Sequence, residues 1–451
     1  MWSIDKIIPP DGVCTIIERL NQHGYEAYIV GGCVRDSIMK LTPHDWDICT
    51  SAKPEQMLKV FADTKVIETG LKHGTITVVL GDGSYEVTTF RRDGEYSDGR
   101  HPDSVQFVTS VAEDLARRDF TMNAMAYSLD FGLIDYFDGE HDVMHETISC
   151  VGNPDERFSE DALRILRALR FASTYGFSIS PATAESIHRN AYRLNNIAAE
   201  RINVELCKLL CGKGALQVLL DYSDVLAVII PELSPCIGFE QNNKFHQYTI
   251  YEHMARAAAS CQTDDVVTRV ALLLHDIGKP QCYTEDHNGG HFYGHAVPSR
   301  DLAERALDRL RFDNKRKKEI LDLILYHDST LEPTPKVARK WLNKLGPEQC
   351  ERLLDIKCAD ARAHAAGTQD ERLSKYEVLR QLMVEAIETQ ACFSMKDLAI
   401  NGNDVMSLGV FQGKIVGKVL NELLAEVING ILPNDRSILM EKARLLIMQG
   451  E

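Results

Sequence analysis

The 451-residue chain has the composition of a globular protein, with 44% hydrophobic and 26% charged residues. It contains no apolar run long enough to span a membrane, and its first residues lack the basic-then-apolar order of a secretion signal. Its 12 cysteines include no Cys-x-x-Cys pair, which argues against zinc knuckles and a disulfide framework. We therefore expect a cytoplasmic protein of about three domains, not associated with a membrane. The net charge of −16 requires that any surface binding nucleic acid be local.

The first part of the chain has the pattern of an α/β domain. A short apolar run ends in Gly31-Gly32, which predicts a strand followed by a turn. Two further runs flank Gly81-Asp82-Gly83, as a β-hairpin requires. The expected elements are strands at 27–30, 46–50, 75–80 and 85–90 and a helix at 34–40.

Beyond about residue 155 the apolar residues recur with the 3.6-residue period of helices. The predicted helices are 158–172, 182–191, 199–211, 250–260, 267–275, 299–310, 316–325, 336–345, 348–359 and 415–429. The expected fold class is therefore α+β, with a small N-terminal α/β head followed by a long all-α body.

Asp45 and Asp47 alternate at the start of a predicted strand, so their carboxylates should point to the same face. Two adjacent carboxylates repel each other unless a cation lies between them, which suggests a Mg²⁺ site. Glu86, on a neighbouring predicted strand, is the best candidate for a third carboxylate. Such a centre could activate an attacking hydroxyl and stabilise leaving pyrophosphate. Taken alone, Asp-x-Asp could equally be an exposed turn.

A glycine loop lies just upstream of the aspartate pair. Gly31 and Gly32 would let the backbone approach a triphosphate, and Arg35, followed by Asp36, favours its negative charge. Gly-Gly-x-x-Arg-Asp followed nine residues later by Asp-x-Asp is a far more specific signal than either half.

With these motifs, the chain resembles the class II nucleotidyltransferases, which comprise CCA-adding tRNA nucleotidyltransferases and bacterial poly(A) polymerases. Residues 117–124 (RRDFTMNA) resemble the family motif that holds the ribose and phosphates of the incoming nucleotide. This likeness implies nucleotide contacts by Arg118, Asp119 and Asn123. Residues 134–139 (IDYFDG) match the linking segment, with Tyr136 where a proline is more usual.

Residues 160–167 (EDALRILR) resemble the family motif that selects the base. On a helix, Asp161 and Arg164 would share a face, and together they offer acceptors and donors to a base edge. An ordinary helix salt bridge is the alternative that the residues alone leave open. The resemblance implies that this pair recognises CTP and then ATP without a nucleic-acid template. Arg167 and Arg170 continue the row and would help to hold the base or triphosphate.

The helical body contains a second set of potential metal ligands, in which two His-Asp pairs are bracketed by other histidines. The pattern resembles the HD superfamily of metal-dependent phosphohydrolases, with 272–280 (LLLHDIGKP) as its most specific segment. The likeness implies phosphatase or phosphodiesterase activity on phosphate-terminated RNA or small nucleotides. It implies a divalent metal, of unknown identity, with the ligands His253, His275, Asp276 and Asp328, and with His295 and His327 as further ligands.

Three substrate assignments compete within the family. Full CCA addition needs a mobile loop after the third carboxylate, and residues 91–104 (RRDGEYSDGRHPDS) fill that position. Enzymes that add only CC tend to lack this loop. Addition of A alone, or poly(A) synthesis, remains an alternative, although bacterial poly(A) polymerases look closer to Glu-Asp-Pro-Val-Arg at the base-selecting motif. From another class, the chain could be an HD phosphohydrolase with a non-catalytic head, but the intact aspartate pair speaks against that.

The predicted substrates and partners are CTP, ATP and tRNA, and the sequence does not give the oligomeric state. The segment 398–404 (LAINGND) also resembles CCA-adding enzymes with a fused HD domain. Basic clusters at 311–318 and 336–344 could grip the tRNA acceptor stem or be solvated helix faces. The expected domains are a catalytic head at 1–150, a base-selecting and RNA-binding neck at 151–240, an HD domain at 241–335 and a tRNA-binding helical body and tail at 336–451.

Overall fold

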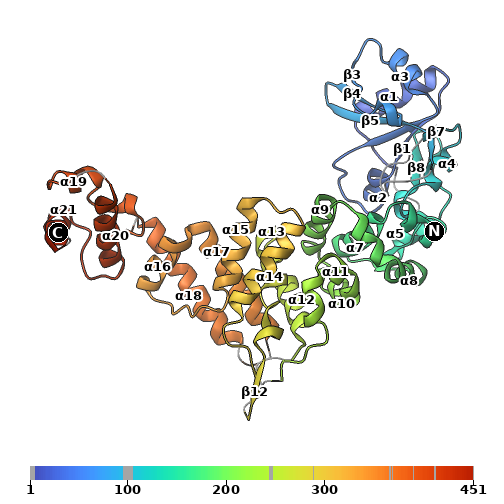
Figure 1. The fold of residues 1–451 in the computed structure, drawn as a ribbon. Helices are drawn as coiled ribbons and strands as arrows, with labels where there is room; N and C mark the ends of the chain where they lie inside the picture. The colour runs from blue at the N-terminus through green and yellow to red at the C-terminus, as the bar shows by residue number, and fades with distance from the viewer. Residues whose placement is uncertain are drawn as a thin grey trace. The chain divides into compact units, whose positions relative to one another are not determined.

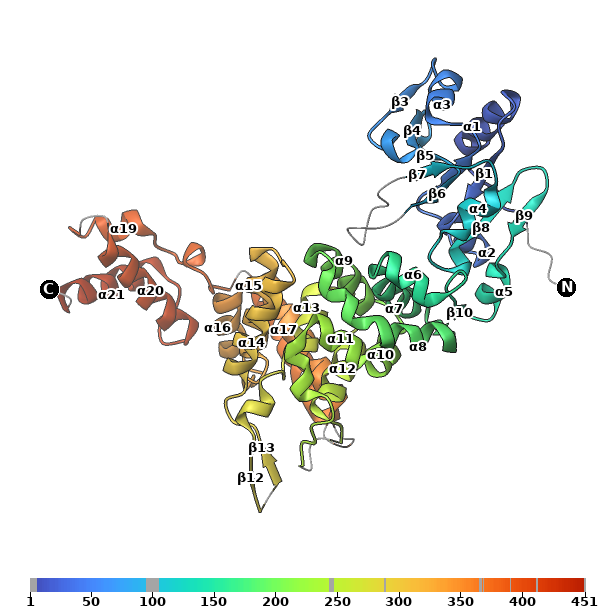
Figure 2. The ribbon, with the colours of Figure 1, turned by 45° about the vertical axis from the view of Figure 1, so that its right-hand side comes forward.

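The chain divides into two compact units, Met1–Pro231 and Glu232–Glu451 (Figures 1 and 2). The computed structural model describes residues 6–94, 105–242, 247–287, 289–364, 367, 369–389, 391–410 and 413–449. Within these residues, no helix has the length and apolar character needed to cross a bilayer. The first unit contains the large sheet, and the second is built mainly of helices, so the predicted α+β organisation is confirmed.

A seven-stranded sheet forms the centre of the head, with the strand order β3-β4-β5-β2-β1-β8-β9. Its strands are β1 (Ala27–Val30), β2 (Asp47–Thr50), β3 (Lys65–Ile67), β4 (Thr75–Leu80), β5 (Gly83–Thr89), β8 (Met125–Ser128) and β9 (Gly132–Asp135). Neighbouring strands are antiparallel except β2 and β5, which are parallel. The predicted strand at 27–30 and the hairpin around Gly81-Asp82-Gly83 are confirmed. The parallel pair matters most, because it brings two predicted site residues together.

Short helices cover the sheet in the blue and cyan part of Figure 1. They are α1 (Asp11–Gln22), α2 (Gly32–Ile38), α3 (Pro54–Val60), α4 (Val111–Ala116) and α5 (Gly139–Met144). Two-stranded pairs are formed by β6 (Arg91–Asp93) with β7 (Val105–Phe107), and by β10 (Thr147–Ile148) with β11 (Ser178–Ile179). Helix α1 buries Val13, Ile16, Ile17 and Leu20, which recur at helical spacing, and it contacts β1, β2 and β5.

Six helices complete the first unit after the head (Figure 2). They are α6 (Pro154–Glu160), α7 (Leu163–Tyr175), α8 (Pro181–Asn190), α9 (Ala199–Leu210), α10 (Ala215–Asp221) and α11 (Ser223–Ile229). The prediction of one helix over 158–172 was wrong, because the chain breaks at Asp161. Asp161 has extended backbone (φ −139°, ψ 104°), and its carboxylate accepts the N–H of Leu163 at 2.9 Å. A short side chain that bonds the following backbone in this way favours a helix start over a helix interior.

In the second unit, helices α12, α15 and α17 pack against α13. The helices are α12 (Ile250–Ser260), α13 (Val266–Leu274), α14 (Ala296–Arg309), α15 (Asn314–Tyr326), α16 (Pro335–Leu345), α17 (Pro347–Ala363) and α18 (Gln369–Glu388). Every residue of α13 from Val267 to Leu274 is buried, and α13 contacts α12, α15 and α17. A helix that is apolar all round belongs in a core. The residues that follow it, His275 and Asp276, are therefore held in the middle of the bundle.

Two smaller features complete this unit. The hairpin of β12 (Thr284–Asp286) and β13 (Gly289–His291) projects from the bundle (Figure 2). The last helices are α19 (Gly402–Met406), α20 (Lys414–Ile428) and α21 (Arg436–Gln449). They share a separate apolar core that includes Val405, Leu423 and Leu439.

Candidate active site and second metal centre

The predicted carboxylates of the head lie on two adjacent strands. The parallel register of β2 and β5 pairs Asp47 directly with Glu86, so the two side chains share a face. Asp45 lies two residues before Asp47, outside the strand, and all three residues are exposed. Shielding from water by the surrounding protein raises the pKa of Asp47, and the charges of Glu86 and Asp45 raise it further, against the opposing effect of Arg118. The site therefore concentrates negative charge that a cation would neutralise.

Gly31 lies beside this cluster and needs to be glycine for two reasons. Its φ of +84° is in the region that L side chains rarely adopt. A Cβ atom on Gly31 would lie 2.8 Å from a guanidinium nitrogen of Arg118. The absence of a side chain at Gly31 thus lets the Arg118 guanidinium lie close to the backbone. The same guanidinium lowers the pKa of Asp47.

Arg35 is engaged within the protein. It is only 6% exposed, and its guanidinium donates to Asp36 at 2.7 and 2.9 Å and to the side-chain oxygen of Asn123. It also lies over the rings of Phe171 and Tyr175, with 5.2 and 4.9 Å to the ring centroids. The structure therefore places Arg35 as a link between the glycine loop and α7, and gives Arg118 the position nearest the loop.

Asp119 connects the nucleotide motif to α7. One oxygen accepts the amide of Asn123 at 3.1 Å, and the other accepts Arg167 through two nitrogens at 2.6 and 2.8 Å. Burial opposes ionisation of Asp119, but the Arg167 guanidinium, assisted by Asn123, lowers its pKa to about 2. Residues predicted from two separate motifs, Asp119 and Asn123 from one and Arg167 from the other, are thus joined in one network.

The base-selecting residues have different partners from those expected. Asp161 pairs with Arg201 of α9 at 2.8 Å, whereas Arg164 pairs with Glu160 at 2.6 Å. Both Asp161 and Arg164 are 9% exposed and sit at adjoining positions around the start of α7. Arg170 bonds Glu205 of α9 at 2.6 Å, which places it in the packing between α7 and α9.

Arg201 was missed by the sequence reasoning. Its only signal was its position four residues before Glu205, which puts both on one face of a helix. Of the specificity loop predicted at 91–104, residues 95–104 lie outside the described residues. Tyr136, the departure from the usual proline, is 57% exposed.

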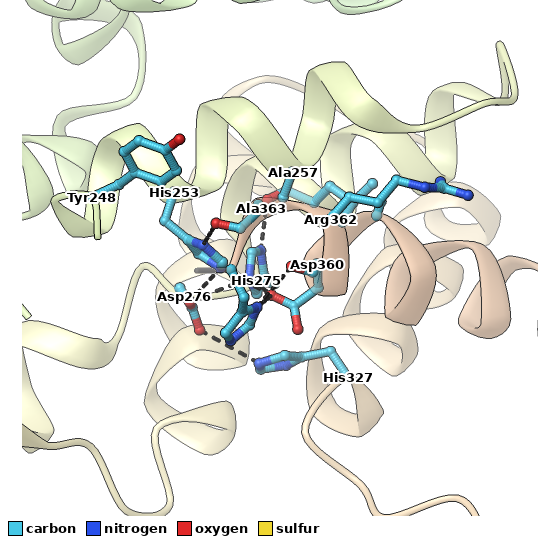
Figure 3. A network of polar contacts seen from close by, with 12 residues as sticks. Tyr248, His253, Ala257, His275, Asp276, His327, Asp360, Arg362 and Ala363 are labelled. Atoms are coloured by element: carbon cyan, nitrogen blue, oxygen red, sulfur yellow. Dashed lines mark hydrogen bonds and ion pairs between the residues drawn. The ribbon is translucent and has the colours of Figure 1, made fainter. Parts of the chain in front are cut away.

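A second cluster lies in the helical unit, where imidazoles and carboxylates converge (Figure 3). His275, His295 and His327 each direct Nδ1 to the backbone carbonyl three residues earlier, at 2.7, 2.8 and 2.6 Å. Because Nδ1 donates in each case, Nε2 is left as the acceptor that faces the cluster. His295 and His327 bring these atoms to 3.0 Å of each other. Two lone pairs at that distance favour a shared proton or metal ion.

Two carboxylates complete the cluster, one buried (Asp276) and one partly buried (Asp360). Asp276 lies 3.0 Å from Nε2 of His295 and 3.2 Å from that of His275. Asp360 of α17 lies 2.9 Å from Nε2 of His253 and 3.4 Å from that of His275 (Figure 3). Against the effect of burial, these carboxylates raise the pKa of His275 to about 10. The centre thus favours a positive charge at this nitrogen.

The fourth predicted ligand, Asp328, lies elsewhere. It is exposed on the wall of the adjoining pocket and belongs to none of the groups of three potential ligands found within 4.8 Å of one another among the described residues. Those groups contain Asp360 and His364 in its place. The spacing Asp360-x-x-x-His364 on a helix is the signal that could have found both.

Three segments of the chain match known domain families. Residues 27–149 match the poly A polymerase head domain, residues 176–237 match the probable RNA and SrmB-binding site of polymerase A, and residues 245–364 match the HD domain. The CCA-adding enzyme of Limosilactobacillus reuteri (strain DSM 20016) is 34% identical over 96% of both chains. The chain belongs to the CCA-adding enzyme family. The CCA-adding enzyme of Lactobacillus delbrueckii subsp. bulgaricus is 47% identical over 49% of this chain and 54% of its own.

Solved structures of CCA-adding enzymes share the fold. The Bacillus stearothermophilus CCA-adding enzyme in complex with CTP covers 98% of both chains, with 31% identity and a TM-score of 0.73. The Thermotoga maritima CCA-adding enzyme complexed with tRNA has 20% identity and a TM-score of 0.60, which shows a common fold.

Domains of both the head and the HD type generally use divalent metal ions, and the residues present suit them. In the HD domain, the buried Nε2 of His275 has no hydrogen-bond partner of good geometry. Nitrogen ligands mixed with carboxylate oxygens are typical of transition-metal sites. In the head, the three clustered residues are all carboxylates, which are the ligands that Mg²⁺ prefers.

Proposed function

We propose that this member of the CCA-adding enzyme family adds CCA to the 3′ end of tRNA from CTP and ATP without a nucleic-acid template. The observation that carries this function is the pairing of Asp47 with Glu86 at the head, in a chain similar to CCA-adding enzymes over 96% of its length. The RNA 3′-hydroxyl attacks the nucleotide α-phosphate, and pyrophosphate leaves.

Asp45, Asp47 and Glu86 are proposed to hold Mg²⁺. A divalent ion bound there would promote deprotonation of the attacking hydroxyl and neutralise charge on the triphosphate. Asp47, whose pKa is raised by shielding from water by the surrounding protein and by its carboxylate neighbours, gains most from such an ion. Its raised pKa indicates that the apo site binds a proton more readily than an ordinary aspartate.

The other head residues are proposed to bind and orient the nucleotide. Gly31 and Gly32 leave room for phosphate oxygens, and Arg118 supplies the positive charge beside them. Asp119 and Asn123 face the same region and bind the ribose and phosphates. Arg35, Asp36, Arg167 and Arg170 act by fixing this wall to α7 and α9.

Base selection is assigned to Asp161 and Arg164. The two side chains present acceptors and donors from the start of α7, where the break in the helix leaves Asp161 clear of the helix interior. Arg201 holds the Asp161 carboxylate on its second oxygen and so acts as a positioning residue. The cytosine and adenine edges would be read at this point in turn.

A second candidate function, metal-dependent phosphohydrolysis, is favoured by the buried His–Asp cluster. We propose that His253, His275, Asp276, His295, His327 and Asp360 hold a divalent metal. Asp328, which is exposed, lines the adjoining pocket and is not part of this ligand group. Loss of metal-dependent phosphodiesterase activity in purified His275→Ala protein is the expected result, and full retention would contradict this function.

The domain division follows the sites. We propose a head at 1–150, a neck at 151–240, an HD domain beginning near 241 and a helical body and tail up to 451. Because Asp360 lies in α17 and the HD match reaches residue 364, the HD domain extends past the boundary expected at 335. Cytoplasmic location remains part of the proposal, because the cysteines of the described residues form no disulfide, which suits a reducing compartment.

The alternatives of A-only addition, poly(A) synthesis, or a non-catalytic head are not favoured. Incubation with CTP, ATP and a tRNA lacking its 3′ end, followed by sequencing of the product, separates them. CCA ends are the expected product. A single A, a run of A, or no extension would each point to one of the alternatives.

A further inference from the structure

The pocket beside the HD metal ligands has a wall that these ligands do not explain. The cavity has a volume of about 850 Å³, and His295, His327, Asp276 and Asp360 contribute to its lining. Its other lining residues include Lys357 of α17, Arg372, Lys375 and Tyr376 of α18, and Tyr293, which follows β13. Helix α18 lies outside the segment that matches the HD domain. The α18 part of the wall therefore comes from the helical body, outside the matched HD segment.

Two cations of this wall are held close to the metal ligands. Lys357 is only 7% exposed, and its ammonium donates to the backbone carbonyl of Ser329. Burial lowers the pKa of Lys357 to about 8, although Asp360 and Asp328 raise it, and Arg372 adds to the lowering. Lys357, Asp360 and Arg372 all line the same pocket.

Arg372 has no protein partner in the part of the chain that the structure describes, although it is half-buried. A guanidinium carries five donors, and those of Arg372 are available to an anion that enters the pocket. Lys375, about one turn further along α18, contrasts with it, because it pairs with Glu371 at 2.9 Å. Both cations line the pocket, and only Lys375 is held by an acidic neighbour on its own helix.

Tyr293 adds an aromatic surface to the lining of the pocket. Tyr293 is 79% exposed, and its ring stacks on that of His291, with centroids 5.2 Å apart and planes 9° apart. An exposed, pre-stacked ring is a favourable platform for a nucleobase. The cavity volume exceeds what a phosphate ion alone would fill and falls within the range of small-molecule pockets.

We propose that Arg372 and Lys357 bind the phosphate of a nucleoside phosphate at the HD metal centre, while Tyr293 stacks on its base. This assignment rests on the proposed HD function, and it names the substrate class as a free nucleotide or a phosphate-terminated RNA end. With a divalent ion held by Asp276 and Asp360, the two wall cations leave the pocket with an excess of positive charge. The ligand is therefore an anion with an aromatic part.

The test uses the full chain loaded with Mn²⁺, and calorimetry to measure binding of inorganic phosphate. Arg372→Gln should weaken phosphate binding about 10-fold or more, as expected for loss of a charge-assisted hydrogen bond. Lys340→Gln, at an exposed position of α16 outside the pocket lining, is the control and should change it less than about threefold. Mn²⁺ affinity, followed by electron paramagnetic resonance, should be unchanged in both variants. Equal phosphate binding by wild type and Arg372→Gln would overturn the proposal.

Two further arms identify the ligand and separate the causes of failure. AMP and a short RNA ending in a 3′-phosphate are titrated, and binding that persists in His295→Ala is assigned to the head and subtracted. Tyr293→Ala should weaken the better of these ligands at least about fivefold while leaving inorganic phosphate unaffected. No Tyr293 effect on either would refute the base platform. Absence of Mn²⁺ binding by the wild type would overturn the HD function itself, whereas Mn²⁺ binding without an Arg372 effect overturns only the wall.

Discussion

Replacing Asp119 with asparagine removes the charge that joins the nucleotide motif to α7. One Asp119 oxygen accepts the Phe120 N–H and the Asn123 amide, and the side-chain oxygen of asparagine could accept both of these hydrogen bonds. The other oxygen, which accepts Arg167 at 2.6 and 2.8 Å, would become an amide that faces two donors. A pKa lowered from 3.8 to about 2 corresponds to about 2 kcal/mol of stability for the ionised form. We therefore expect Asp119→Asn to lose at least about 2 kcal/mol at pH 7.

The sign of the pH dependence follows from the direction of the shift. A carboxylate whose pKa is lowered on folding stabilises the native state above its unfolded-state pKa, and this contribution is lost as the pH falls through the folded value. The difference between wild type and Asp119→Asn should thus be constant from pH 8 to pH 5 and shrink between about pH 4 and pH 2.

Differential scanning calorimetry of the full chain measures this difference. The transition of the first unit should fall by about 4–8 °C, given about 2–4 °C per kcal/mol for a unit of this size. Asp130→Asn, at an exposed position in the same unit, is the control and should shift the transition by less than about 1 °C. A loss under about 0.5 kcal/mol, or one that changes between pH 8 and pH 5, would refute the assigned Asp119–Arg167 bond.

Three further predictions concern the glycine loop, the base-selecting residues and the second metal centre. Gly31→Ala should raise KM for nucleotides about 10-fold or more, because a Cβ would lie 2.8 Å from Arg118 and the backbone φ is one that alanine adopts only with strain. Steady-state kinetics showing an unchanged KM would argue against the close approach of Arg118 to Gly31. Arg201→Ala should reduce the preference for CTP over UTP, measured by competition, because Asp161 loses the partner that fixes its carboxylate. Arg201→Lys should retain more of this preference. Equal discrimination by wild type, Arg201→Ala and Arg201→Lys would contradict the positioning role. Removing metal with a chelator should lower the free energy of unfolding of the second unit by about 2.7 kcal/mol, if the ion was present at 100 times its Kd. The thermal transition of this unit should fall accordingly. A transition that changes neither with chelator nor with added Mn²⁺ would show that no ion stabilises the cluster.

Local signals predicted the head well. The hairpin around Gly81-Asp82-Gly83 and the strand at 27–30 depend on turn residues and apolar runs that act over a few residues. The pairing of Asp47 with Glu86 was expected only as proximity between neighbouring strands. Its exact parallel register depends on how β2 inserts between β1 and β5, which no local pattern encodes.

The errors and omissions have physical causes. The helix over 158–172 looked continuous because its apolar residues keep the helical period, but the Asp161 carboxylate bonds the Leu163 N–H and starts a new helix there. The partner of Asp161 is Arg201, 40 residues away, and only tertiary packing of α7 on α9 brings them together.

The metal centre shows the same limit. His275-Asp276 and His327-Asp328 look equivalent in sequence, yet Asp276 is buried and Asp328 is exposed. The preceding helices differ: α13 is buried at every residue from Val267 to Leu274, whereas α15 buries only one face. The bundle supplies Asp360 in its place, from a helix that sequence alone assigned only to the body.

The most direct test of the catalytic assignment compares CCA addition by wild type, Asp47→Asn and Glu86→Gln. Each protein receives a tRNA ending before CCA, with CTP, ATP and Mg²⁺, and single-turnover incorporation is followed by gel and product sequencing. Both variants should lose at least about 1,000-fold in rate, because several kcal/mol of metal-dependent stabilisation depend on these carboxylates. Glu55→Gln, in α3 of the same head, should extend the tRNA normally. Incorporation near the wild-type rate by either carboxylate variant would contradict the assignment of the catalytic centre to the β2–β5 pair.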